Sequence, residues 1–420
     1  MSKVSFVAGG GANSIGRSFY RLKLGDYHLG VDWGGGYGSI YDEPQYDGPL
    51  DALLISHGHH DHATMVAKLH HRYPELKIFA TAPTRDLSIL NWRQTIKKAL
   101  GLKQNPPFDG YDVERTLSMI RLFRVNEELK LNDEISVFPL PAGHILGAVS
   151  FLVSYQEEYY FFTNDICFHS RYLIDGAPSF RFERCRLLIR ESTYINKDVG
   201  DREATKQQFI AAAAKVIERR GRLLVPGLSI DRIQDVFGDL YESGLWPIYI
   251  DGARKPTEIY LHYLDGRASS LGKALRFRNE RERMQFLKSR QPSVIIASSG
   301  MIYPNTLSAF WAENLLYQKN DAIFIVNYQE PDGQGFLLKT APDGKFIKWN
   351  DGIVQVRCER KDFNKSAHMD GPEGEALEER LNPDTIIYTH GENDEIDRYI
   401  ASHQDKKQRI KALEGKEVEL

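Results

Sequence analysis

The chain has 420 residues, of which 42% are hydrophobic, a composition that suits a globular protein of two or three domains. Its net charge of −3 gives no overall basic character for binding phosphates. No apolar stretch reaches membrane-spanning length, and the opening MSKVSFVAGG lacks the layout of a signal peptide, so we expect a cytoplasmic protein without membrane contact. The three cysteines form no Cys-x-x-Cys pair, which argues against a disulfide framework or a cysteine zinc site.

The first part of the chain contains two series of short apolar segments that predict strands. The first series lies at 4–8, 18–24, 27–33, 52–56 and 78–81. Helical spacing follows at 59–73 and at 85–120, where paired prolines interrupt it. The second series lies at 120–125, 129–132, 135–140, 150–155 and 159–165. Two sheets flanked by helices, an αββα arrangement, would accommodate this order.

After residue 197 the pattern changes to strands that alternate with helices, such as 205–220 followed by 222–228. This alternation predicts a small parallel α/β domain. The last part then contributes further polar motifs and a closing helix at 399–416. We therefore expect an α/β protein in three segments: 1–197 and 353–420 form one domain, and 198–352 forms a second domain inserted into it.

Residues 54–63, LISHGHHDHA, gather four histidines and an aspartate directly after an apolar strand. In extended chain the side chains of His57 and His59 point to the same side and can converge on one ion, whereas His60 points away. If a helix starts near Asp61, then Asp61 and His62 can reach a second ion. Imidazole nitrogen and carboxylate oxygen are both ligands of zinc, so the string predicts a metal site.

The string resembles the His-x-His-x-Asp-His signature of metallo-β-lactamase fold hydrolases. Three further residues match that family's order: Asp32 in YHLGVDWGGG, His144 in AGHILGAVSFLV and Asp165 in YYFFTNDICFHS. The resemblance implies that His144 is a third histidine ligand and that Asp165 bridges two metal ions. It also implies that Asp32 hydrogen-bonds the ligands and fixes their orientation.

Three more motifs resemble those of the β-CASP nucleases, the group that includes the polyadenylation-cleavage endonuclease and RNase J. They are Glu191 in RESTY, His368 in KSAHMDG and His390 in THGE. The resemblance implies that His390 completes the shell of the second metal and favours RNA over DNA. After Ser299-Gly300-Met301 the chain departs from the family's glycine-rich pattern, which leaves any phosphate contact there in doubt.

These resemblances imply a two-metal phosphodiesterase that holds two Zn²⁺ ions, with Mn²⁺ as the alternative. Water between the ions would attack the scissile phosphate, with Asp61 among the ligands that take part in catalysis. His368 would donate a proton to the leaving oxygen, and Glu191 would orient it. Endonuclease and 5′→3′ exonuclease action are both left open, as is a homodimer.

A basic stretch within the inserted segment offers a candidate nucleic-acid surface. Residues 254–290 contain four acidic residues and ten lysines or arginines, among them Arg276, Arg278, Arg281 and Arg283. Phe277 and Phe286 lie among these basic residues and could lie near bases. A solvated helix with mixed charge explains the same run equally well. Three rival functions are also left open: a DNA nuclease, a small-ester or thioester hydrolase, and a non-catalytic subunit of an RNA-processing complex.

Overall fold

The computed structural model divides into two compact units, and it describes residues 3–331, 333–342, 344–349, 352–403 and 407–420. The first unit comprises Met1–Ser170, Ile174–Asp198 and Ala367–Leu420, and the second comprises Arg171–Leu173 and Val199–Ser366. The second unit is therefore inserted into the first. The chain returns to the first unit at Ala367, whereas the sequence predicts this return at residue 353.

The first unit is built on two seven-stranded sheets. The first sheet has the order β21-β1-β2-β3-β4-β5-β6, and the second has the order β20-β19-β11-β10-β9-β8-β7. The strands of the first sheet are β1 (Val4–Gly10), β2 (Phe19–Leu24), β3 (Tyr27–Val31), β4 (Ala52–Leu54), β5 (Lys77–Ala80), β6 (Ile120–Leu122) and β21 (Glu417–Glu419). Those of the second are β7 (Leu129–Lys130), β8 (Ile135–Pro141), β9 (Val149–Tyr155), β10 (Glu158–Phe162), β11 (Cys185–Glu191), β19 (Thr385–Thr389) and β20 (Gln408–Lys411).

The inner faces of these two sheets share one apolar core. Phe6 and Leu22 of the first sheet belong to the same buried cluster as Phe151 and Phe162 of the second. Each such side chain contributes about 1.5–3 kcal/mol when it leaves water, so this layer stabilises the sandwich and fixes which strand faces point inward. The strand ends that carry polar motifs are thereby held in place.

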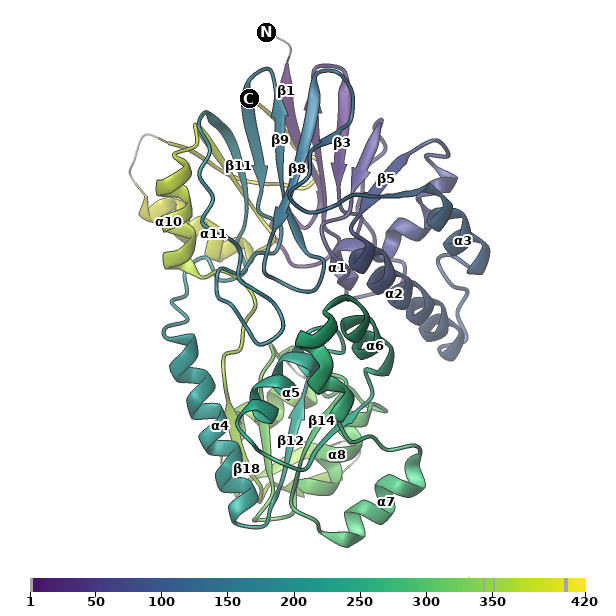
Figure 1. Cartoon of the computed structure of the whole chain (residues 1–420), viewed down its shortest axis with the longest axis vertical. Coiled ribbons are helices and arrows are strands. Elements are labelled where there is room, and N and C mark those ends of the chain that lie inside the picture. Colours follow the sequence, from purple (N-terminus) through teal and green to yellow (C-terminus); the bar gives the residue numbers. More distant parts are fainter. Residues whose placement is uncertain (1–2, 332, 343, 350–351, 404–406) are drawn as a thin grey trace. The chain divides into compact units, whose positions relative to one another are not determined.

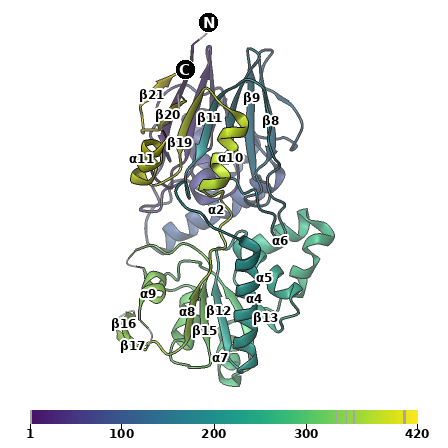
Figure 2. The same ribbon diagram turned by 90° about the vertical axis from the view of Figure 1, so that its left-hand side faces the viewer.

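Helices cover the outer faces of both sheets, which confirms the αββα arrangement (Figures 1 and 2). Trp92 and Val113 pack with Leu53 and Ile78 on the outer side of the first sheet, and the Trp92 indole donates to Ala63 O at 2.9 Å. The helices on that side are α1 (His60–Ala63), η1 (Thr64–His71), α2 (Ala82–Gly101) and α3 (Gly110–Met119). On the second sheet they are α10 (Gly371–Leu381) and α11 (Asn393–Ser402).

A buried ion pair joins the helices to the second sheet. Arg190 of β11 is 1% exposed on its side chain and donates to the Glu378 carboxylate of α10. Tyr388 of β19 donates to the same carboxylate at 3.0 Å, and Arg409 of β20 also contacts it. Gly374 is required here, because a Cβ would lie 1.7 Å from the Arg190 guanidinium. The network fixes β19 beside β11.

The second unit has a parallel five-stranded sheet of order β13-β14-β12-β15-β18, as the alternating pattern predicts. Its strands are β12 (Arg222–Pro226), β13 (Ile248–Asp251), β14 (Ser293–Ala297), β15 (Ala322–Ile325) and β18 (Glu359–Asp362), and a hairpin adds β16 (Phe346–Trp349) and β17 (Gly352–Gln355). Its helices are α4 (Arg202–Glu218), α5 (Arg232–Glu242), α6 (Arg254–Tyr263), η2 (Asp265–Lys273), α7 (Glu280–Ser289), α8 (Leu307–Leu315) and α9 (Gln334–Thr340).

The predicted closing helix at 399–416 is wrong over most of its length. Helix α11 ends at Ser402, residues 404–406 lie outside the described part, and Gln408–Lys411 form β20. This segment pairs in parallel with β19, whose edge hydrogen bonds outweigh its local helical preference. Among the described residues, none of the helices is both long enough and apolar enough to cross a membrane.

Candidate metal centre

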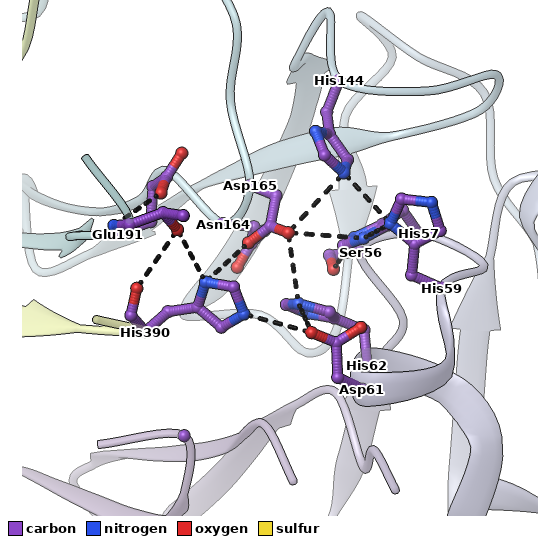
Figure 3. Close-up of polar contacts among 12 residues, drawn as sticks. Ser56, His57, His59, Asp61, His62, His144, Asn164, Asp165, Glu191 and His390 are labelled. Atoms are coloured by element: carbon purple, nitrogen blue, oxygen red, sulfur yellow. Dashed lines mark hydrogen bonds and ion pairs between the residues drawn. The ribbon is translucent and has the colours of Figure 1, made fainter. Parts of the chain in front are cut away.

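The polar motifs meet because the strands before them run in the same direction. Strands β3 and β4 are parallel, as are β10, β11 and β19, so residues just beyond their carboxyl ends gather at one edge of the sandwich. Figure 3 shows the resulting cluster. Its members are Asp32 after β3, His57, His59, Asp61 and His62 after β4, His144 after β8, Asp165 after β10, Glu191 at the end of β11 and His390 after β19.

One group of potential ligands consists of His57, His59, His144 and Asp165. The Nε2 atoms of His57 and His144 each lie 3.1 Å from His59 Nδ1. Asp165 Oδ2 lies 3.7 Å from His57 Nε2 and 3.6 Å from His144 Nε2. Three imidazoles and one carboxylate thus point at a common position, a donor set that suits zinc.

A second group consists of Asp61, His62 and His390. Asp61 Oδ2 lies 3.3 Å from His390 Nε2 and 3.8 Å from His62 Nε2. Asp165 reaches this group too, with Oδ2 3.4 Å from His62 Nε2 and Oδ1 3.4 Å from His390 Nδ1. One carboxylate therefore contacts ligands of both groups.

Two buried atoms in this cluster support ion binding. His62 Nε2 and Asp165 Oδ1 are shielded from solvent and make no hydrogen bond. A buried polar atom without a hydrogen bond is costly, by about 1–3 kcal/mol. A cation between the two groups would satisfy both atoms, so the residues present fit metal ions.

Asp32 orients two of the histidines. It is fully buried, with φ +62°, and its Oδ2 accepts from His62 Nδ1 at 2.7 Å. Ser56 donates to Asp32 through both its backbone N–H and its hydroxyl, each at 2.7 Å, and the same hydroxyl lies 3.0 Å from His57 Nδ1. With Nδ1 of both histidines engaged in this way, Nε2 is left to face the cluster as a lone-pair donor.

His144 and His390 are oriented by partners far away in the sequence. His144 Nδ1 donates to the Ala367 carbonyl at 2.8 Å. Thr193 Oγ1 lies 3.1 Å from His390 Nδ1, and the His390 backbone N–H donates to Gly11 O at 2.8 Å. The glycine-rich segment near residue 11 thus lies beside the site.

The electrostatics of the cluster favour a cation. Burial and the nearby charge of His62 lower the pKa of His57 well below its ordinary value, and burial does the same for the pKa of His144. Burial alone would also lower the pKa of His62, but Asp165, Asp61 and Asp32 raise it well above the ordinary value. Three carboxylates buried around one histidine leave negative charge that metal ions would neutralise.

Glu191 and His368 form a pair beside both groups. Glu191 Oε1 accepts from His368 Nδ1 at 3.0 Å, and Thr193 N–H donates to Glu191 Oε2 at 3.2 Å. The His368 ring centre lies 4.7 Å from that of His144 and 6.2 Å from that of His390, and 18% of its side chain is exposed. His368 is therefore close to the candidate ligands but belongs to neither group.

His60 points away from the cluster, as predicted. Its Nε2 lies 3.0 Å from Gly36 O and its Nδ1 lies 3.0 Å from Thr64 Oγ1, so it anchors the glycine-rich loop after β3. Gly34 in that loop packs on the motif's backbone, where a Cβ would lie 1.7 Å from Asp61 O. Sequence reasoning overlooked Ser56, although it directly precedes the motif.

The basic stretch belongs to the second unit, and two of its arginines form hydrogen bonds within that unit. Arg283 forms two hydrogen bonds with the buried Asp251, at 2.6 and 2.7 Å, and Arg276 donates to Gly252 O at 3.2 Å. Arg278 and Arg281 are exposed. Phe277 is half-buried against the unit's apolar core, and Phe286 is buried inside it, so the suggestion that Phe286 contacts bases is wrong. Their ring centres lie 4.7 and 4.8 Å from that of Tyr249.

Two protein-family domains match the chain. A metallo-beta-lactamase superfamily domain matches residues 39–192, and a Zn-dependent metallo-hydrolase RNA specificity domain matches residues 353–413. The first match includes the histidine string, His144, Asp165 and Glu191. The second includes His368 and His390, so the two matched segments jointly supply the cluster apart from Asp32.

Similar proteins cover most of this chain. The probable RNase MJ4 of Methanocaldococcus jannaschii is 27% identical over 91% of this chain and 92% of its own length. The transcription termination factor FttA of Pyrococcus horikoshii is 27% identical, and endoribonuclease YSH1 of Gibberella zeae is 24% identical. The chain spans 65% and 53% of the lengths of these two relatives. A crystal structure of a protein of unknown function from Enterococcus faecalis V583 shares the fold, with a TM-score of 0.63 at 15% identity over 100% of both chains.

Proposed function

Because the chain belongs to the metallo-β-lactamase superfamily and carries its RNA specificity domain, we propose that it is a zinc-dependent ribonuclease of the β-CASP group. The observation that carries this proposal is the position of Asp165, which contacts ligands of both groups while the Glu191–His368 pair lies beside them. The names of the relatives support RNA as the substrate. An ester hydrolase of the same fold would not need that pair together with the RNA specificity domain.

In this proposal two Zn²⁺ ions are held by the two groups. His57, His59 and His144 hold one ion, Asp61, His62 and His390 hold the other, and Asp165 is shared. Bound zinc supplies Lewis acidity and an activated water, which phosphodiester hydrolysis needs at neutral pH.

The protein's own side chains would then orient the reactants and move the proton. Asp32 and Ser56 keep the Nε2 lone pairs of their histidines directed at the ions. Glu191 accepts a hydrogen bond from His368 Nδ1–H, which fixes the ring and stabilises its protonated form. Protonated His368 donates a proton to the departing oxygen as the phosphodiester bond breaks, which makes it the general acid.

Three labelled substrates test the proposal: a single-stranded RNA, a DNA of the same sequence and a nitrophenyl carboxylic ester. We expect cleavage of the RNA, loss of that cleavage after chelation, recovery with Zn²⁺, and two zinc ions per chain by elemental analysis. Comparing product ends from RNA with a 5′-phosphate and a 5′-hydroxyl distinguishes endonuclease from exonuclease action.

Each rival function gives a different result in the same assay. Cleavage of DNA alone would make the protein a DNA nuclease, and hydrolysis of the ester alone would make it a small-molecule hydrolase. RNA binding without cleavage by the zinc-loaded protein would indicate a non-catalytic subunit. Any of these outcomes refutes the proposed ribonuclease activity.

A further inference from the structure

A third cluster of potential metal ligands lies outside the centre described above. His70 and His71 end η1, and both face Asp112 in the first turn of α3. Asp112 Oδ1 lies 2.9 Å from His70 Nε2 and 2.8 Å from His71 Nε2. Two imidazole nitrogens and a carboxylate oxygen therefore converge, although η1 and α3 are separated by the whole of α2.

Hydrogen bonds from neighbouring residues fix the Asp112 carboxylate and hold η1 against α3. Asp112 Oδ2 accepts from the Asp109 backbone N–H at 2.8 Å within a capping box, which holds the carboxylate in one orientation. Thr116 of α3 donates to Ala67 O of η1 at 3.0 Å, which fixes one helix against the other. The ligand atoms would thus be positioned before an ion binds, which lowers the cost of ordering them.

The surroundings also suit a ligand that enters from solvent. The side chains of His70 and Asp112 are 8% and 10% exposed, whereas that of His71 is 61% exposed. The cluster is therefore buried on one side and open on the other. Two histidines and one carboxylate make up a three-ligand set that zinc enzymes use, with water in the open fourth position.

We propose that His70, His71 and Asp112 form a separate binding site for one Zn²⁺ ion, which joins η1 to α3. Binding requires each neutral imidazole to carry its proton on Nδ1 and to offer the Nε2 lone pair to the ion. Without an ion, the two Nε2–H groups donate to Asp112 instead, and the cluster is a hydrogen-bonded clamp. The proposal does not depend on the activity of the other centre.

Competition with a chromophoric zinc chelator tests the site in the full chain. We expect His71→Ala to bind one Zn²⁺ fewer per chain than the parent. If His71→Ala still binds this additional ion, we expect its affinity to be at least tenfold lower. His262→Ala, which removes an exposed histidine from the second unit, is the matched control and keeps the parent's stoichiometry. Because His71 is exposed, the substitution leaves the apolar core intact.

A second variant separates this site from the other centre. Asp165→Ala changes the shared ligand of that centre and is expected to retain the zinc ion that depends on His71. Co²⁺ loaded into Asp165→Ala should give visible d–d bands, and the double variant with His71→Ala should lose the part of these bands that arises from the site at His70, His71 and Asp112. Equal zinc stoichiometry and affinity in the parent and His71→Ala would overturn the proposal and leave the clamp as the only role of the cluster.

Discussion

Replacing Glu191 by glutamine tests the proton donor without removing any candidate metal ligand. Glutamine can keep an oxygen where Glu191 Oε1 now accepts from His368 Nδ1 at 3.0 Å, but it loses the negative charge and the oxygen that accepts from Thr193 N–H. A hydrogen bond to a charged group contributes about 1.5–3 kcal/mol, against about 0.5–1.5 kcal/mol for a neutral one. The difference of about 1–1.5 kcal/mol corresponds to a roughly five- to thirteenfold slower cleavage of RNA.

Replacing His368 by alanine removes the donor itself, and the expected loss is larger. Loss of a general acid costs about 10²–10⁴-fold in rate, or about 3–5 kcal/mol in the barrier. Neither group of candidate ligands includes Glu191 or His368, so both variants should keep the parent's zinc content and RNA affinity.

Single-turnover cleavage of RNA, compared with hydrolysis of a nitrophenyl phosphodiester, separates proton donation from other roles. The nitrophenolate leaving group needs no proton, so both variants should hydrolyse this substrate at nearly the parent rate. If His368→Ala loses a zinc ion, the residue is a ligand. If it cleaves RNA at the parent rate, the proton comes from another group and the proposed role is refuted.

Three further predictions concern the metal centre, the fold and the basic stretch. Asp165→Ala should lower the zinc content measured by elemental analysis, because one carboxylate contacts both groups, and unchanged content would exclude a shared ligand. Glu378→Ala should lower the free energy of unfolding by about 3–5 kcal/mol, because it leaves the buried guanidinium of Arg190 without its carboxylate. The control Glu379→Ala, at an exposed position, should change the free energy of unfolding by about 0.5 kcal/mol or less. Burial alone would raise the pKa of Glu378, but the neighbouring guanidinium groups lower it. Its stabilising contribution should therefore be full above about pH 4.3 and be lost as the pH falls through the lower folded-state pKa, which acid titration of both proteins would detect. Arg281→Ala should weaken RNA binding and reduce by about 1 the slope of log affinity against log salt concentration. Arg283→Ala should instead mainly lower stability, because it removes the ion-pair partner of the buried Asp251. If Arg281→Ala binds RNA as tightly as the parent at every salt concentration, this helix face is only solvated.

The sequence predicts the cluster well where the signal is local. The string from His57 to His62 places several ligand types on consecutive residues, and an apolar strand before it fixes the direction in which they emerge. Asp165 likewise follows an apolar strand directly. His368 and His390, which lie far along the chain, are predicted only through family resemblance, because no local pattern connects them to the string.

The predictions from sequence fail where tertiary contacts determine the structure, because such contacts produce no pattern in the neighbouring residues. The segment QRIK at Gln408–Lys411 is polar and has good helix formers, yet it pairs with β19 as an edge strand. Phe286 of the basic stretch lies among arginines in sequence but inside an aromatic core in space. The carbonyl of Ala367, which orients His144, could not be identified either, because a backbone group has no residue-type signature.

The parallel pairing of β19 with β11 has a consequence for biosynthesis. A growing chain acquires His57, His144 and Asp165 early, but His390 is made only after the whole inserted unit. Glu378, which neutralises Arg190 beneath the same strands, is equally late. Until the segments that carry Glu378 and His390 emerge from the ribosome, the second group lacks a candidate ligand and β11 lacks its partner strand β19. The second group of candidate ligands is therefore complete only after the whole inserted unit has been translated.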